Sequence, residues 1–252
     1  MAAWLRSAPA TYGYLCILVV TSWSLRGVSP HTADELIRAQ STNLDNLADR
    51  PLQVLVASAF WTSGSTLPWQ LLIRFTLVMA PVERRLGTRR TVAVFAAGHV
   101  LATLLVGAGI DVGLRHHLLD LDLAHASDVG VSYGFYAVAG ALTWLLVPRR
   151  WCVVWVAGLL ASITVATLNE VTFTDVGHFV SLAIGLGTWP LVTRWQRFPV
   201  PRAPLGGRPI VVPRKLVQHV VRALAARRGP GHGGPTPRAD ASAGAPTAQS
   251  TD

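Results

Sequence analysis

Two short segments of the chain combine a reactive side chain with small residues. Residues 130–134 read GVSYG and carry Ser132, and residues 177–185 read GHFVSLAIG and carry His178. A serine hydroxyl holds its proton at neutral pH and is a poor nucleophile alone, but a histidine within hydrogen-bond reach takes that proton and later returns it. Polar pairs inside apolar helices usually mark a site, because water is scarce there. The residue types therefore predict a nucleophilic Ser132–His178 dyad.

Two sets of residues recur at helical spacing, and each set occupies one helix face. The sets are Ser132, Tyr136 and Gly140, and His178, Ser181 and Gly185. The glycines and Ser181 have almost no side chain, so two helix backbones can approach closely at these faces. We expect this approach to bring the serine to the histidine, with Tyr136 one turn below the serine and stacked on the imidazole.

The segments that must position these residues are apolar. The chain has 252 residues, 51% hydrophobic and 14% charged, and its mean hydropathy is +0.40. Soluble domains carry about a quarter charged residues. Six apolar runs span roughly Thr11–Leu25, Leu67–Val82, Thr91–Leu114, Val129–Val147, Trp151–Leu168 and Val176–Val192. The predicted fold is an all-α bundle of six transmembrane helices, although several runs lie at or below the usual length of about 17 to 25 residues.

The connecting segments alternate in charge. Segments 83–90 and 149–150 are basic, whereas loops 26–66, 115–128 and 169–175 are acidic. The positive-inside rule therefore places both termini in the cytoplasm of a multi-pass plasma-membrane protein, with the long first loop outside. Alternatively, the first run is a cleaved signal peptide, which would leave five spans and an outer N-terminus.

The composition predicts three regions. These are a cytoplasmic N-terminus (1–10), the membrane domain (11–193) and a basic cytoplasmic tail (194–252). The tail holds ten Lys/Arg and two Asp, so its net charge is +8 out of +9 for the whole chain. Residues 211–228 can form a short basic amphipathic helix against anionic lipid. Beyond Gly229 the composition is typical of disorder. The tail lacks aromatics between its basic residues, so no nucleic-acid partner is expected.

The order of these motifs resembles the rhomboid family of intramembrane serine proteases. The residues that carry the resemblance are Gly130, Ser132, Tyr136, Gly140, Asp175, His178 and Gly185, together with the segment VERRLGTR at 82–89, which looks like the family's Glu-x-x-x-Gly signature. It covers about residues 41–193. The resemblance implies a six-helix bundle in which Ser132 is the nucleophile and His178 is the general base and then acid. The implied partners are transmembrane substrates within the lipid bilayer, with no cofactor.

Three departures from the family pattern leave two functions open. Tyr133 stands where the family commonly has glycine, and we expect its bulky side chain to narrow the path of the substrate to Ser132. Ser181 replaces another common glycine. The stretch 67–71 reads LPWQL and lacks the family's His-x-x-x-Asn oxyanion pair. Gln70 or the Ser132 amide would then donate instead, and the loss of one oxyanion donor costs roughly 10² to 10³ in rate. The chain is therefore either an intramembrane endopeptidase or an inactive relative that binds or escorts membrane clients.

Two further polar residues lie inside apolar runs. His99, in the third run, is expected either to form structural hydrogen bonds or to support the site. Arg74 falls near the middle of the second run, where a charge costs at least about 2.5 kcal/mol. We expect it either to pair with Asp111 or Asp175 or to contact the substrate.

No metal site is expected. His116, His117 and His125 share an outer loop with three aspartates, but their spacing fits no strong zinc pattern, and an exposed loop is the preferred interpretation. A haem bundle that uses His99 and His178 is a third functional class. Their depths differ by roughly 10 Å at 1.5 Å per residue, which fits poorly with two ligands of one iron.

Overall fold

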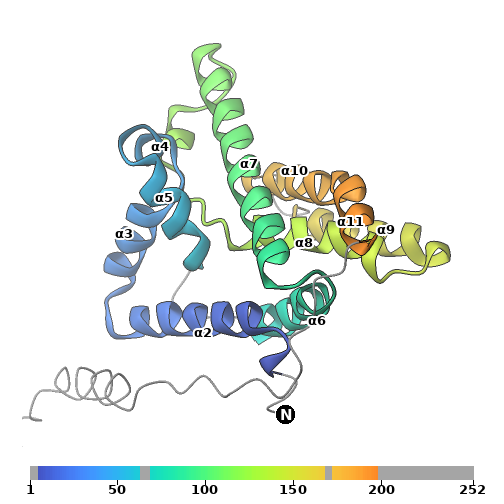
Figure 1. The fold of residues 1–252 in the computed structure, drawn as a ribbon. Coiled ribbons are helices and arrows are strands. Elements are labelled where there is room, and N and C mark those ends of the chain that lie inside the picture. The colour runs from blue at the N-terminus through green and yellow to red at the C-terminus, as the bar shows by residue number, and fades with distance from the viewer. Residues whose placement is uncertain (1–4, 63–68, 168–171, 198–252) are drawn as a thin grey trace, which may run out of the picture. The chain divides into compact units, whose positions relative to one another are not determined.

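The computed structural model describes residues 5–62, 69–167 and 172–197. Within these ranges every regular element is a helix, in agreement with the predicted all-α class (Figure 1). The tail beyond residue 197, with its expected amphipathic helix and disorder, lies outside the described residues. So do residues 67 and 68 of the stretch that lacks the oxyanion pair.

The main helices of the described residues follow the apolar runs of the sequence. They are α2 (Pro9–Ser24), α6 (Trp69–Leu86), α7 (Thr88–Arg115), α8 (Val131–Leu145), α9 (Cys152–Thr167) and α10 (Phe173–Gly187), which α11 (Trp189–Arg197) follows. The long loop after α2 forms α3 (Pro30–Gln40), α4 (Leu44–Asp49) and α5 (Pro51–Ala57). Single 3-10 turns cover Leu25–Gly27, Ser58–Phe60, Leu121–His125 and Arg149–Trp151.

Two of the described helices are long and apolar enough to cross a membrane alone, namely Thr88–Arg115 and Phe173–Gln196. The others are shorter or carry more charge. With 15 residues, α8 rises only about 22 Å at 1.5 Å per residue, less than the roughly 30 Å hydrocarbon core. The count of six spans therefore stays a prediction, which requires thinned lipid around the short helices.

The central helix of the bundle is α8, which packs against α6, α7, α9, α10 and α11 (Figure 1). All of its residues except Ser132 and Trp144 are buried. A helix that is apolar on every side is stable only when other helices surround it. Ser132 is thus a polar, partly exposed position on an otherwise enclosed helix.

Small residues let α8 and α10 touch along their length. A Cβ added to Gly140 would lie 2.8 Å from the carbonyl oxygen of Leu182, and one added to Gly185 would overlap the carbonyl of Ala137. Ser181 donates a hydrogen bond to a backbone carbonyl of α8. Backbone contacts of this kind are possible only where side chains are nearly absent.

A buried carboxylate joins α2 to the turn between α6 and α7. Glu83 Oε1 accepts hydrogen bonds from the Ala10 amide (2.9 Å) and the Thr88 hydroxyl (2.7 Å). Its Oε2 accepts from the Thr11 amide (2.8 Å) and hydroxyl (2.7 Å). Gly87 adopts φ 83°, a conformation that favours glycine and that closes the turn. The Glu-x-x-x-Gly spacing therefore caps α2 and reverses the chain with one motif.

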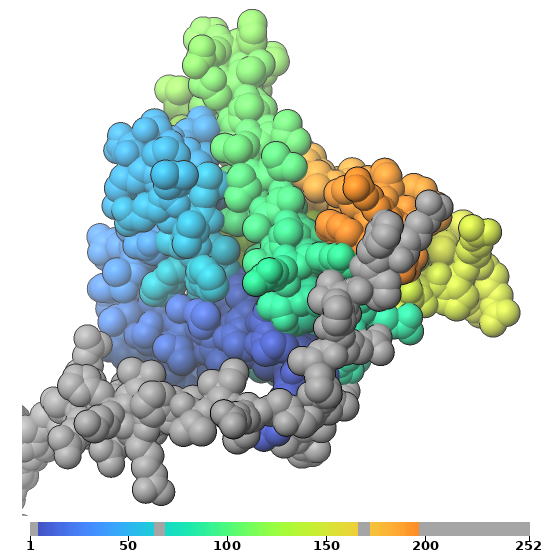
Figure 2. Space-filling view, in the orientation of Figure 1, coloured from blue at the N-terminus to red at the C-terminus, as the bar shows by residue number. Residues whose placement is uncertain are grey.

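The loop after α2 folds onto the bundle beside α7 (Figure 2). Leu44 and Leu47 of α4 lie against Gly107 of α7. The apolar segment 51–61, too short to cross a membrane, forms α5 and the 3-10 turn Ser58–Phe60. Thr21 of α2 donates to the Phe60 carbonyl at 2.9 Å, so the turn is fastened to the first helix. This returning segment reaches the start of α8.

Candidate active site

Ser132 and His178 lie in contact at the ends of two packed helices. Ser132 occupies the first turn of α8, and His178 lies in the second turn of α10. His178 Nε2 and Ser132 Oγ are 2.8 Å apart, and the imidazole is only 14% exposed. When the ring proton is on Nδ1, the hydroxyl donates to Nε2. That is the arrangement in which a histidine can act as a general base on a serine.

Two tyrosine rings hold the imidazole in place. The Tyr136 ring lies 4.8 Å from the His178 ring, centroid to centroid, at 46°, and the Tyr133 ring lies 5.6 Å away, edge-on at 80°. Aromatic pairs at these separations and angles attract each other. The Tyr136 hydroxyl is also 3.2 Å from Ser162 Oγ on α9. The rotation of the His178 ring is therefore restricted from two sides.

Asp175 lies beside the dyad but makes no hydrogen bond to the imidazole. Asp175 Oδ1 is 3.8 Å from His178 Nδ1, too far for a hydrogen bond. The other oxygen of Asp175 accepts from the Thr172 amide at 2.9 Å and from its hydroxyl at 2.8 Å, which forms the capping box of α10. Asp175 thus fixes the start of the helix that carries His178.

His99 of α7 packs against the start of α8. Its Nε2 lies 2.8 Å from the Leu55 carbonyl and 3.2 Å from the Ser58 hydroxyl, and the side chain is buried. The Gly130 amide donates to the Ser58 carbonyl at 3.1 Å. A Cβ on Gly130 would overlap the His99 ring, so this position needs glycine. His99 lies against Gly130, the first residue of the serine segment, and its hydrogen bonds are to Leu55 and Ser58 and not to the dyad.

A polar chamber of about 530 Å³ opens beside the dyad. Its wall includes Gln70 of α6, Asp128 before α8 and Thr174 of α10, besides Ser132 and His178. Gln70 thus faces the same space as the serine hydroxyl. The Ser132 amide belongs to the first turn of α8, where backbone N–H groups have no partner in their own helix. Both groups are candidates to hold an oxyanion.

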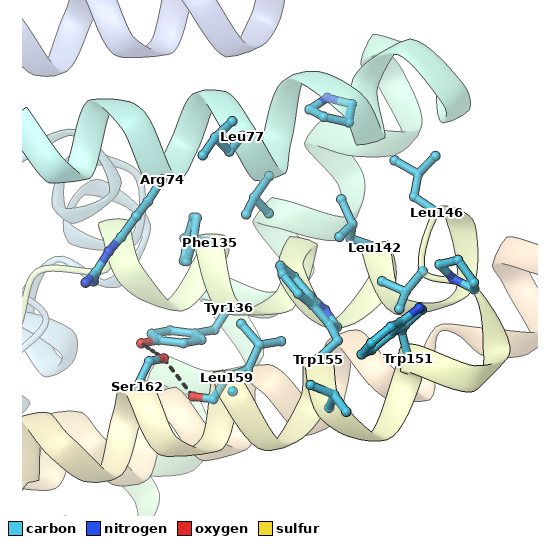
Figure 3. A pocket seen from close by; sticks show the side chains of 16 residues that line it. Arg74, Leu77, Phe135, Tyr136, Leu142, Leu146, Trp151, Trp155, Leu159 and Ser162 are labelled. Carbon is cyan, nitrogen blue, oxygen red and sulfur yellow. Dashed lines mark hydrogen bonds between the residues drawn. The ribbon is translucent and has the colours of Figure 1, made fainter.

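An apolar groove of about 730 Å³ joins the chamber (Figure 3). Helices α6 and α9 form its sides, and α8 forms its floor. Trp151 and Leu146 lie at one end, and Arg74 lies at the other. Four residues line both spaces, namely Arg74, Phe135, Tyr136 and Ser162. The groove therefore leads along α8 to the dyad.

The predicted ion pairs of Arg74 are wrong. Asp111 pairs with Arg115 at 2.9 Å, one turn along α7, and Asp175 caps α10. No carboxylate of the described residues lies within ion-pair distance of Arg74. Its exposed side chain points into the space shared by the groove and the chamber (Figure 3).

Tyr133 does not narrow the approach to the serine, contrary to expectation. Its side chain is fully buried and packs over Gly177 of α10, where a Cβ would overlap the phenol ring. Tyr133 lines neither the groove nor the chamber. The position after the serine points away from it, because successive residues on a helix are about 100° apart.

Sequence reasoning missed several polar residues of the chamber, among them Asp128, Ser162 and Thr174. Asp128 was assigned to an exposed loop, yet only 4% of it is exposed. Burial raises its pKa from 3.8 to about 6, and the hydroxyls of Tyr133 and Thr174 beside it act in the opposite direction. Its position two residues before the glycine that starts α8 was the available signal. Ser162 was detectable as a hydroxyl within an apolar helix, whereas nothing in the sequence marked Thr174.

Three of the histidines named for metal or haem binding, His99, His125 and His178, have protein partners. His125 Nδ1 lies 2.5 Å from Asp45 Oδ2 on α4. The Nε2 atoms of His99 and His178 contact different groups, Leu55 and Ser132, so the two rings do not share a ligand position. Across residues 5–62, 69–167 and 172–197, no three His, Cys, Asp or Glu side chains gather as a metal site.

Comparison with known proteins gives one match. Neither the curated proteins nor the solved structures match the chain. The family model described as rhomboid-like protein matches residues 3–197, which include every helix from α2 to α11. This match confirms the resemblance drawn from the motifs of α6, α8 and α10. The chain belongs to the rhomboid-like protein family.

Proposed function

We propose that this protein is an intramembrane serine endopeptidase in which Ser132 is the nucleophile and His178 the general base. The observation that carries the proposal is the 2.8 Å contact between His178 Nε2 and Ser132 Oγ in the wall of a polar chamber. We further propose that the six main helices span the membrane with both termini in the cytoplasm. The charge of the loops supports that orientation.

The substrate in this proposal is the transmembrane segment of another protein. The groove between α6 and α9 is lined mainly by apolar side chains, such as Leu77, Leu142 and Leu159. It suits a segment that comes from lipid, and it leads to the chamber at Ser132. Because helix carbonyls are hydrogen-bonded within the helix, the segment must unwind locally before one of them can reach the serine.

The proposed reaction uses the dyad twice. Ser132 Oγ attacks the substrate carbonyl carbon while its proton moves to His178 Nε2, and a tetrahedral oxyanion forms. The C–N bond then breaks, and the same proton passes from Nε2 to the leaving amine. Water next attacks the acyl ester, again through His178, which releases the new carboxyl group and restores Ser132. The chamber provides the polar space that this water requires.

The Ser132 amide and Gln70 are the proposed donors to the oxyanion. Both belong to the chamber wall, and electrostatic stabilisation of this charge is commonly the largest contribution to catalysis. Leu71 lies in the same wall, within the stretch 67–71 where the resemblance implies a His-x-x-x-Asn pair. An apolar residue there removes one donor and makes a slow enzyme the expected outcome.

The same leucine favours a second candidate function. A protein without that donor can still bind transmembrane clients in the groove and escort them without cutting them. In that case the contact between Ser132 and His178 would be a structural hydrogen bond between α8 and α10. The two functions differ in one property, the reactivity of the Ser132 hydroxyl.

A fluorophosphonate probe tests that reactivity in membranes. We expect labelling of the wild type, loss of labelling in Ser132→Ala and in His178→Ala, and full labelling of Ser24→Ala, which changes an exposed serine away from the chamber. Cleavage of a labelled single-span substrate should follow the same order. Unchanged cleavage by Ser132→Ala would exclude Ser132 as the nucleophile. An unlabelled wild type that still binds the substrate would favour the escort function.

A further inference from the structure

Arg74 is the cation at the junction of the groove and the chamber. It lies one helical turn after Gln70, so both side chains leave α6 on the same face. In Figure 3 its side chain extends from α6 along the side on which Phe135 and Tyr136 lie. Any segment that moves from the groove to Ser132 must pass this guanidinium, because Arg74 belongs to the walls of both spaces.

Among the residues that the structure describes, no carboxylate pairs with Arg74 at this junction. The titratable groups in the chamber wall are Arg74, Asp128, Tyr136 and His178. Asp128 is buried beside the hydroxyls of Tyr133 and Thr174, and it forms no ion pair with Arg74. His178 is in contact with Ser132. A guanidinium in a membrane helix without a carboxylate partner is costly, and such residues usually serve a ligand or a pathway.

The depth of Arg74 separates two sources of a matching anion. The residue lies near the middle of the apolar run Leu67–Val82, away from both ends of the run. A lipid phosphate stays near headgroup level, at the helix end. A carboxylate on a segment bound in the chamber would lie at the depth of Arg74 itself. The position therefore favours a substrate side chain over a lipid headgroup.

We propose that Arg74 determines substrate specificity by pairing with an acidic side chain close to the bond that is cut. This inference rests on the proposed endopeptidase function. A guanidinium and a carboxylate can form two parallel hydrogen bonds, which gives geometric selection as well as attraction. An acidic residue is penalised in lipid, so a segment that carries one gains from leaving the lipid for this chamber.

The size of the preference follows from the energy of a charged hydrogen bond. Such bonds contribute about 1.5 to 3 kcal/mol, which corresponds to about 10- to 100-fold in rate at 1.4 kcal/mol per tenfold. The test uses the full chain in vesicles and three single-span substrates that differ at one residue next to the cleavage site. With Asp, Asn or Lys there, the wild type should cut the Asp substrate fastest and the Lys substrate slowest.

Variants that change the charge at position 74 test whether Arg74 itself sets this preference. Arg74→Glu should reverse the order, so that the Lys substrate is cut fastest, and Arg74→Gln should make the three rates nearly equal. Arg115→Glu applies the same charge change to an exposed arginine away from the chamber and should keep the wild-type order. The wild-type series by itself remains a complete test if the Arg74 variants fail to fold.

Three outcomes would overturn the inference, and they have different meanings. Equal rates for the three substrates with the wild type would reject Arg74 as a specificity residue and leave the protease function intact. Rates that follow the anionic lipid content of the vesicles, and not the substrate charge, would assign Arg74 to lipid phosphate. Absence of both cleavage and fluorophosphonate labelling would reject the proposed function and the inference with it.

Discussion

Replacement of Glu83 by glutamine tests whether one buried carboxylate holds the first helices together. Glu83 is 2% exposed and accepts four hydrogen bonds, two from backbone amides at the start of α2 and two from threonine hydroxyls. Glutamine has almost the same shape but only one acceptor oxygen. The substitution therefore changes the acceptors without creating a cavity.

The expected loss can be worked from the geometry. If the new amide nitrogen takes the place of Oε1, the Thr88 hydroxyl can rotate to accept from it, whereas the Ala10 amide can only donate and loses its partner. A buried N–H without a partner costs about 1 to 3 kcal/mol, and the partly buried Ala10 amide lies toward the lower end of this range. The remaining bonds lose the strength that the charge gave them. The negative charge at the α2 N-terminus adds about 0.3 to 1 kcal/mol. We expect Glu83→Gln to lower the free energy of unfolding by about 2 to 4 kcal/mol.

Unfolding of the purified protein in mixed micelles of increasing denaturing-detergent fraction measures this difference. Glu35→Gln is the matched control, because Glu35 is exposed and its contact with His31, 3.6 Å long, is also exposed. Exposed pairs contribute about 0 to 1 kcal/mol, so the control should unfold close to the wild type. If Glu83→Gln unfolds together with the control, the four bonds do not hold α2 to the bundle and the reasoning is wrong.

Two further predictions concern packing and pH. Gly185→Val would drive a side chain into the Ala137 carbonyl and should lower the free energy of unfolding by more than about 2 kcal/mol. Gly187→Val is the control and should be nearly neutral in the same assay, because a Cβ added there meets nothing within 4 Å. Similar losses in both variants would contradict the close contact of α8 and α10. Because burial raises the pKa of Asp128 from 3.8 to about 6, the folded protein keeps a proton that the unfolded chain releases between these values. The free energy of unfolding should therefore fall by up to about 3 kcal/mol as pH rises from about 4 to 6, and an unchanged slope in Asp128→Asn would refute this assignment.

Spacing in the sequence was enough to predict which helix faces meet. The recurrence of small residues at Gly140, Ser181 and Gly185 predicted close contact between the fourth and sixth apolar runs, and the backbones of α8 and α10 touch at these positions. Helical periodicity is a local property, so it can be read without knowledge of the fold. The family of the chain was recognisable for the same reason, because its motifs lie within single helices.

Contacts between distant segments were not readable in this way. The position of Asp128 before α8 was a signal, but the segments that surround it are distant in the sequence: the Thr42 amide, 86 positions earlier, donates to the Asp128 carbonyl at 2.9 Å. The direction of the Tyr133 side chain likewise depends on the space that Gly177 leaves on α10. Arg74 was assigned to carboxylates that helix capping and a neighbouring arginine already occupy. Competition among partners is settled only by tertiary structure.

The packing of α8 on α10 and the chemistry proposed for Ser132 both depend on glycines in the contact between the two helices. Ser132 and Gly140 are two turns apart on one rigid helix, so the approach permitted at Gly140 also sets the distance from Ser132 to His178. A methyl group at Gly140 or Gly185 would overlap the facing backbone and force the helices apart. The 2.8 Å contact of Nε2 with Oγ would then exceed hydrogen-bond length, and the serine would lose its base. Substitutions far below the chamber should therefore impair reactivity before they unfold the protein, because a hydrogen bond tolerates less displacement than a helix interface does.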